Sequence, residues 1–297
     1  MWPLKINNNT HMKNVRIGGV PEHFNYAWYL ALKQGHFKPH DINVRWKNYF
    51  GGTGQMTKAL RDNEIDIAVI LTEGIIKDIT EGSPCKIVQV FVESPLIWGI
   101  HVAQNSAFKQ LSDLKGQRAA ISRYGSGSHL MAYVNALELG WDTATDLEFE
   151  VVKDLDGAVE ALTHEKADYF MWEKFTTKPL VDQQIFRRLG DCPTPWPCFV
   201  IAVRDEFITN EKETLQAILK VINTITAGFK QIPEIDAIIS ERYQQKNEDV
   251  KNWLELTEWS QKNIHPSTVE AVQNQLLKLD IISEKLPFDR LVATLEN

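Results

Sequence analysis

The chain has 297 residues, of which 43% are hydrophobic and 10% aromatic, and its formal net charge is −7. This length suits one large or two ordinary domains, and the apolar content supports a packed core. An intrinsically disordered chain, a collagen-like repeat and a disulfide-stapled small fold are therefore excluded. Acidic and basic residues are interspersed without a basic block, so nucleic acid is not expected as a partner.

Metal, membrane and secretion signals are missing from the sequence. The cysteines, Cys85, Cys192 and Cys198, form no Cys-x-x-Cys pair, and no His-Glu-x-x-His occurs, so we predict no metal site and no cofactor. No apolar run reaches the ~20 residues of a membrane span. The N-terminus lacks the apolar stretch of a secretory signal, so a cytoplasmic location is expected, or a periplasmic one if an export signal was removed. Residues 1–11 are interpreted as an expression remnant or a native tail before a second start at Met12.

Short apolar runs alternate with helical patterns in the first part of the chain. The patterns predict strands at 15–20, 44–47, 65–71 and 86–92, and helices at 25–34, 55–62 and 73–81. The run at 65–71 is apolar except for Asp66, which is typical of a strand covered on both faces. This rhythm predicts a mostly parallel sheet with helices on both faces.

The pattern restarts near residue 110 and turns helical beyond residue 205. Strands are predicted at 118–122, 149–152, 167–172 and 198–203, and helices at 128–139 and 156–163. Asn210 with Glu213, and Ser267 with Glu270, form capping-box patterns before apolar helical stripes.

Two α/β units followed by helices predict two lobes with a cleft between them. Strand-like segments at 98–102 and 196–203 are the expected crossings. Residues 12–100 and 200–297 would then form a discontinuous first lobe, and residues 103–195 the second. Ligands of α/β proteins bind at strand ends, so the cleft is the expected site.

In the first lobe, candidate ligand residues follow the ends of two predicted strands. His23 and Asn25 can hydrogen-bond a ligand and Phe24 can stack on one; alternatively they form a turn with Asn25 as the helix N-cap. Thr53 and Gly54 lie in a glycine loop whose N–H groups can face an anion at the helix start. The loop matches no nucleotide motif, and a tight turn is the alternative.

Further candidates lie at the next strand ends. Thr72 and Glu73 can touch a ligand, although Glu73 is also an ordinary first-turn acid favoured by the helix dipole. Ser94 and Trp98 lie at the first expected crossing, where both can line the cleft mouth; alternatively, Trp98 packs a hinge.

The sharpest local pattern is the loop 123–129. Gly125 and Gly127 allow a ligand to approach the backbone closely, while Ser126 and Ser128 add hydroxyl donors at the start of a helix. Arg123 adds positive charge. The loop therefore favours an anionic or hydrogen-bond-accepting ligand group, and the alternative is that the serines only cap the helix.

The second lobe also offers aromatic residues. Trp172 can stack on a ring and Glu173 can meet a cation or a donor; alternatively Glu173 forms an ion pair with a neighbouring lysine. Trp196, in a proline-broken loop, completes the candidate ligand-binding set. No residue is assigned a catalytic role, and Cys198 is interpreted as a buried small apolar residue.

These residues resemble the type II periplasmic-binding-protein superfamily over most of residues 15–205. Within it, the chain is similar to the sulfonate, nitrate and taurine-binding proteins of ABC importers and to fungal thiamine-pyrimidine synthase-like proteins. The shared strings are WYLALKQGHF at 28–37, GTG at 52–54, EIDIA at 64–68 and LSDLKG at 111–116. A closer resemblance, to a bacterial and fungal branch without an assigned ligand, rests on PEHF at 21–24, LTEG at 71–74, SPL at 94–96, WGIH at 98–101, GSGSHLMA at 125–132, MWEKF at 171–175 and TPWP at 194–197.

The resemblance implies a two-lobed α/β fold with a helical C-terminal region and a solute-binding function. The protein would be a monomer that closes two lobes about a small-molecule ligand and, in an importer, meets ABC transporter membrane subunits. The alternative is an enzyme of thiamine-pyrimidine or related metabolism, with Cys198, His23 or Glu73 as the reactive group. The pyrimidine synthases carry a cysteine-rich iron motif, whereas this chain has only Cys198 in the comparable region.

Overall fold

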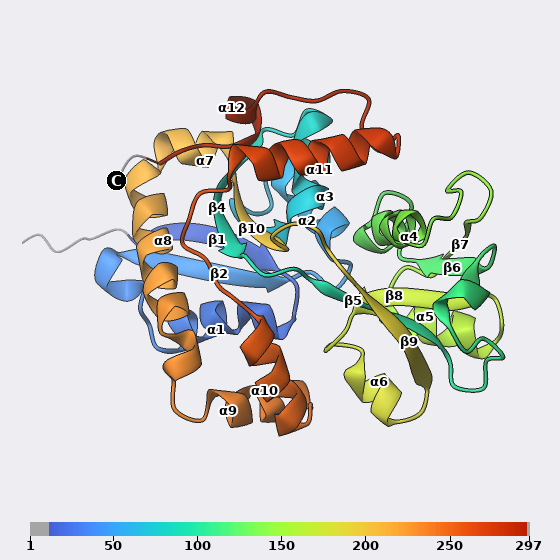
Figure 1. Ribbon diagram of the computed structural model, residues 1–297. Coiled ribbons are helices and arrows are strands. Elements are labelled where there is room, and N and C mark those ends of the chain that lie inside the picture. The colour runs from blue at the N-terminus through green and yellow to red at the C-terminus, as the bar shows by residue number, and fades with distance from the viewer. Residues whose placement is uncertain (1–11, 296–297) are drawn as a thin grey trace, which may run out of the picture.

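The computed structural model describes residues 12–295, and its framework is two five-stranded sheets (Figure 1). The first sheet has the order β2-β1-β3-β10-β4. Its strands are β1 (Lys13–Gly19), β2 (Ile42–Asn48), β3 (Ile67–Leu71), β4 (Cys85–Val92) and β10 (Phe199–Arg204). Four of the five run in one direction, and β10 runs against them.

The second sheet has the order β7-β6-β8-β5-β9. Its strands are β5 (Ile97–Ala103), β6 (Arg118–Ile121), β7 (Glu148–Val151), β8 (Tyr169–Glu173) and β9 (Phe186–Pro193). Here β5 alone runs against the other four. The sole antiparallel strand of each sheet is thus the one that enters it from the other sheet. The predicted class, two mostly parallel sheets flanked by helices, is confirmed.

Helices flank both sheets (Figure 1). The first part of the chain contributes α1 (Tyr26–Lys33), α2 (Thr53–Arg61), α3 (Thr72–Thr80), α4 (Gly127–Glu138), α5 (Leu155–Thr163) and α6 (Lys178–Asp182). The C-terminal part contributes α7 (Asp205–Asn210), α8 (Lys212–Ala227), α9 (Ile235–Tyr243), α10 (Asn247–Leu256), α11 (Pro266–Lys278) and α12 (Phe288–Leu291). Helix α8 packs against α1 and α11 against α3, while α4 and α5 cover the second sheet. None of the helices in residues 12–295 is both long and apolar enough to span a bilayer.

Two short connections carry the chain between the sheets. Residues 93–96 join β4 to β5, and residues 194–198 join β9 to β10. Hydrogen bonds hold them side by side: Thr194 N–H donates to the carbonyl of Leu96 at 2.9 Å, and Leu96 N–H donates to Thr194 Oγ1 at 3.0 Å. The predicted division of the chain into two lobes that move about these connections stays a prediction.

Strand β9 was not among the predicted elements. Arg187, Arg188 and Gly190 interrupt its apolar pattern, and only Phe186 and Cys192 are buried. Charged side chains are tolerated there because β9 is an edge strand that pairs with β5 alone.

Both predicted capping boxes are wrong. Helix α7 ends at Asn210, and α8 begins at Lys212 without a side-chain cap. At the second position α11 begins two residues earlier than expected, because Pro266 occupies the first turn and His265 is the N-cap. The imidazole of His265 then accepts the hydrogen bond from Ser267 N–H at 3.3 Å.

Candidate functional site

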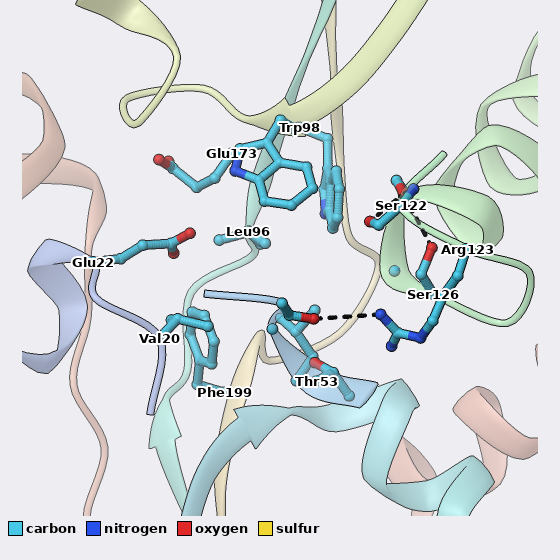
Figure 2. Close-up of a pocket in the computed structure, with 16 residues that line it drawn as sticks. Val20, Glu22, Thr53, Leu96, Trp98, Ser122, Arg123, Ser126, Glu173 and Phe199 are labelled. Atoms are coloured by element: carbon cyan, nitrogen blue, oxygen red, sulfur yellow. Dashed lines mark hydrogen bonds between the residues drawn. The ribbon is translucent and has the colours of Figure 1, made fainter. Parts of the chain in front are cut away.

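A cavity lies between the two sheets, at the carboxyl ends of strands from both (Figure 2). Its lining residues come from the ends of β3 and β8, from the loops that follow β1, β2 and β6, from the connection 93–96, and from the starts of α2, α4, β5 and β10. They are Val20, Glu22, Gly51, Gly52, Thr53, Leu71, Leu96, Trp98, Ser122, Arg123, Ser126, Gly127, Ser128, Trp172, Glu173 and Phe199. The space open to the centres of water molecules is about 60 Å³. A small ligand fits this space, and a larger one requires the walls to separate.

Aromatic and aliphatic side chains form the walls. The rings of Trp98 and Trp172 lie edge to face, with centroids 6.4 Å apart. Gly127 lies against both sides of the cavity, because a Cβ there would come within 3.1 Å of Leu71 Cδ1 and of Trp98 Cη2. The close approach between Leu71 of the first sheet and helix α4 therefore depends on glycine.

Three serines and the start of helix α4 form a polar wall. Ser126 is the N-cap, and its hydroxyl accepts a hydrogen bond from His129 N–H at 3.3 Å. Ser128 Oγ lies 3.1 Å from the hydroxyls of both Ser122 and Ser126. Ser126 thus caps the helix and also lines the cavity, so the two alternatives for this residue are compatible. The first N–H groups of a helix lack intrahelical acceptors and carry partial positive charge, which suits an anion.

Replacing Ser128 by alanine is expected to destabilise the free protein. Ser128 Oγ accepts a hydrogen bond from Ser122 N–H at 3.0 Å, and both residues are buried. An orphaned buried N–H costs about 1–3 kcal/mol, which lowers the melting temperature by ~2–10 °C in a chain of this size. Thermal unfolding of Ser128→Ala measures the effect, with Ser112→Ala at an exposed position as control. An unchanged melting temperature would show that the Ser122–Ser128 bond is not needed.

Arg123 brings a positive charge that no described residue neutralises. Its Nη1 donates to the carbonyl of Gly51 at 3.3 Å, and no carboxylate of residues 12–295 forms an ion pair with it. The guanidinium lies directly against the Cα of Gly54, where any Cβ would overlap it. Loss of solvent lowers the pKa of Arg123 from its ordinary value. An anion in the cavity would supply the missing counter-charge.

Two carboxyl groups lie on the other side of the cavity from Arg123 (Figure 2). Glu173 is buried, and its Oε2 accepts hydrogen bonds from Thr176 N–H at 2.6 Å and from the Thr176 hydroxyl at 2.8 Å. Burial raises the pKa of Glu173 to about 7. Burial and the neighbouring charge of Glu173 raise the pKa of Glu22 to about 8. Glu22 was absent from the sequence candidates, although it stands beside His23 in the same loop.

The structure places about half of the candidate residues in the cavity wall. Those that line it are Thr53, Trp98, Arg123, Ser126, Gly127, Ser128, Trp172 and Glu173. Gly54 stands behind Arg123, as described above. Gly125 has a φ of +75°, and its N–H donates to His129 Nδ1 at 3.1 Å, outside the cavity wall.

The three candidates that follow β1 belong to an aromatic cluster behind the wall. The centroid of the His23 imidazole lies 4.3 Å from that of the Trp253 ring and 5.1 Å from that of the Phe24 ring. Burial lowers the pKa of His23 to about 3, so the ring is neutral. The amide of Asn25 donates to the carbonyl of Val20 at 2.9 Å, which holds the loop after β1.

Four further candidates hold the connections between the sheets. The hydroxyl of Thr72 donates to the carbonyl of Pro197 at 2.5 Å, and Trp196 Nε1 donates to Glu73 Oε2 at 2.8 Å. These two bonds fasten the connection 194–198 to the start of α3. Ser94 Oγ accepts a hydrogen bond from the backbone N–H of Glu258 at 3.1 Å, which fastens the other connection to the C-terminal region.

No cysteine of residues 12–295 and no metal-ligating cluster lies in the cavity wall. Within residues 12–295, no three His, Cys, Asp or Glu side chains are grouped to hold a metal ion. Cys198 is fully buried, and burial raises the pKa of its thiol well above the ordinary value. Its Sγ faces the carbonyl of Val92 at 4.0 Å.

Comparison with known proteins supports this architecture. A family profile described as Ca3427-like periplasmic binding protein matches residues 98–192, which span β5 to β9. None of the curated proteins matches the chain.

Solved structures match nearly the whole chain. The Candida albicans CA3427 gene product, described as defining a new family with the generic periplasmic-binding-protein fold, is 25% identical, with a TM-score of 0.87 over 96% of this chain and 98% of its own. The alkanesulfonate-binding protein SsuA from Xanthomonas axonopodis pv. citri, bound to MOPS, is 15% identical, with a TM-score of 0.80 over 95% of this chain and 98% of its own. The aliphatic sulphonate binding protein SsuA from Escherichia coli is 18% identical, with a TM-score of 0.72 over 96% of this chain and 94% of its own.

The sheet orders, the inter-sheet cavity and these matches lead to one conclusion. The chain has the type II periplasmic-binding-protein fold and is similar to the Ca3427-like proteins and to the SsuA sulfonate-binding proteins.

Proposed function

We propose that this protein binds a small anionic molecule in the cavity between its two sheets, with Arg123 as the principal ligand contact. The observation that carries the proposal is the unneutralised guanidinium beside the Ser126 cap and the start of α4. A solute-binding role is supported by the fold and by the similar solved structures whose names state the class of ligand that they bind. Because two of those neighbours bind sulfonates, sulfonates are the first ligands to test here.

The protein would hold its ligand by closing two lobes about the connections 93–96 and 194–198. Several contacts bridge the segment that follows β8 and the C-terminal helices. The side-chain amide of Gln245 donates to the carbonyl of Phe175 at 2.8 Å, Lys178 pairs with Asp249 at 3.3 Å, and Lys246 pairs with Asp182 at 3.0 Å. These contacts support the interpretation that this is the closed arrangement, and opening would break them.

The positions of the candidate reactive groups favour binding over catalysis. Cys198, His23 and Glu73 were the groups that an enzyme of thiamine-pyrimidine metabolism would use, and none of them lines the cavity. Membrane subunits of an ABC importer would be the partner of a protein that delivers its ligand unchanged.

A ligand screen followed by scattering tests this function. We expect one or more anions from a panel of sulfonates, carboxylates and phosphates to raise the melting temperature by several degrees. The same anion should reduce the radius of gyration in small-angle X-ray scattering, and mass spectrometry should recover it unchanged after prolonged incubation. A chemically converted product would establish the enzyme instead. A panel without any stabilising anion would refute the proposal.

A further inference from the structure

We propose that the ligand is zwitterionic: while its anion binds Arg123, a protonated amine at its other end binds Glu22 and Glu173. This inference rests on the proposed function and adds a second subsite to the same cavity. Both glutamates line the cavity, and Figure 2 shows them on the side away from Arg123. The cavity therefore presents one cation and two acids at separate places along apolar walls.

No described residue neutralises the two glutamates. The Glu22 carboxyl accepts no hydrogen bond from residues 12–295, and neither glutamate forms an ion pair with them. Lys174 is next to Glu173 in the sequence, but its Nζ binds Asp191 at 2.8 Å. A structural role explains Glu173 Oε2, which holds the turn at Thr176, but it gives no reason for a second acid, Glu22, in the same wall.

In the part of the chain that the structure describes, the groups around the pair supply no ion-pair partner, and the guanidinium of Arg242, which contacts Tyr243, lies over the Tyr29 ring, 3.8 Å from its centroid. His23 is neutral, Lys174 is engaged by Asp191, and the phenol of Tyr243 and the thiol of Cys198 carry no positive charge. Loss of solvent raises the pKa values of both carboxyl groups, and the charge of Glu173 adds to the rise at Glu22. A cation placed between them would reverse this effect and would be the strongest available source of affinity at that end.

Matched pairs of ligands separate the two subsites. Homotaurine and butanesulfonate share a sulfonate and differ by an ammonium in place of a methyl group. The pairs γ-aminobutyrate and pentanoate, and aminopropylphosphonate and butylphosphonate, repeat the comparison with other anions. We expect the ammonium member to bind the wild-type protein ~10–100-fold more tightly than its methyl partner, as charge-assisted hydrogen bonds predict.

The double variant Glu22→Gln with Glu173→Gln should remove this preference. Affinity for the ammonium ligand should fall ~10–100-fold, while affinity for the methyl ligand should stay within ~3-fold. Glu160→Gln, an exposed acid on α5, is the matched control and should leave both affinities unchanged. Circular dichroism and thermal unfolding establish that the variants fold, and the single variants serve where the double variant does not.

The affinity for the ammonium ligand should also depend on pH, in a direction that a purely structural role of Glu22 and Glu173 would not produce. Since the pKa values are about 8 for Glu22 and about 7 for Glu173, both acids lose their protons as the pH rises from 6 to 8.5. The affinity for the ammonium ligand should therefore increase over this range, with proton release in calorimetry. The affinity for the methyl ligand should stay level or decrease.

The outcomes distinguish this inference from the proposed function. If both members of a pair bind equally and both depend on Arg123, the anion site stands and the amine subsite is refuted. If no member of any pair binds while another anion of the panel does, the amine subsite is refuted and the proposed function stands; if no anion of the panel binds, both fail. An ammonium preference that persists in the double variant would place the amine elsewhere and overturn the assignment to Glu22 and Glu173.

Discussion

Replacing Arg123 by methionine is expected to weaken binding of the anionic ligand by ~100-fold or more without destabilising the free protein. A charge-assisted contact at a desolvated site contributes about 1.5–3 kcal/mol per hydrogen bond, and a guanidinium can make two such bonds to an anion. Within residues 12–295, Arg123 has no carboxylate counter-ion in the free protein, and the only hydrogen bond of its side chain is to the Gly51 carbonyl, at 3.3 Å. Methionine retains most of the packing volume and removes a poorly solvated charge, so the melting temperature should be unchanged or higher.

Arg118→Met is the matched control for this variant. Arg118 lies at the start of β6, at the opposite end of the strand from the cavity, and its Nε binds Asp168 at 2.9 Å. Its loss should lower stability modestly and leave ligand affinity unchanged. Calorimetric titration and thermal unfolding of both variants give the comparison. Equal affinity of the wild type and Arg123→Met for the anion would show that Arg123 does not bind it.

Gly54→Ala is expected to weaken binding by ~10–100-fold while leaving the free protein as stable as the wild type or more so. The new Cβ would occupy the position of the Arg123 guanidinium, which must then turn away. The guanidinium is the end of a flexible side chain, so moving it costs little stability in the free protein. Gly54 has no positive φ and lies in the first turn of helix α2, where alanine is compatible with the helical backbone.

A double-variant cycle isolates the mechanism of this effect. If Gly54 acts by making room for Arg123, then Gly54→Ala should have no further effect on affinity in the Arg123→Met background. Additive losses in the double variant would mean that Gly54 contacts the ligand by itself.

The fold was predictable because its local patterns are strong. Continuous apolar strands such as β3 and glycine-ended helices alternate in order, and short runs of this kind suffice for an α/β assignment. The edge strand β9 was not predictable in the same way, because Arg187 and Arg188 break its alternation and only its pairing with β5 makes it a strand.

The candidate site was predictable only where a residue's orientation is set locally. The loop between β6 and α4 carries Ser126, Gly127 and Ser128 into the cavity because they occupy the start of a helix at a strand end. Arg123 follows the same strand, and it too lines the cavity.

Other orientations depend on distant segments. The ring of His23 turns away from the cavity toward Trp253, which α10 supplies from far along the chain. Glu73 is engaged by Trp196, 123 residues away in sequence. No pattern near His23 indicates that its neighbour Glu22, and not His23 itself, lines the cavity.

A crystal structure of the complex with the tightest-binding anion of the panel tests the central claim most directly. We predict the anionic group inside the cavity that Trp98 and Trp172 line, within hydrogen-bonding distance of the Arg123 guanidinium and of the Ser126 hydroxyl. An anion bound outside the cavity, or one inside it without contact to Arg123, would contradict this account.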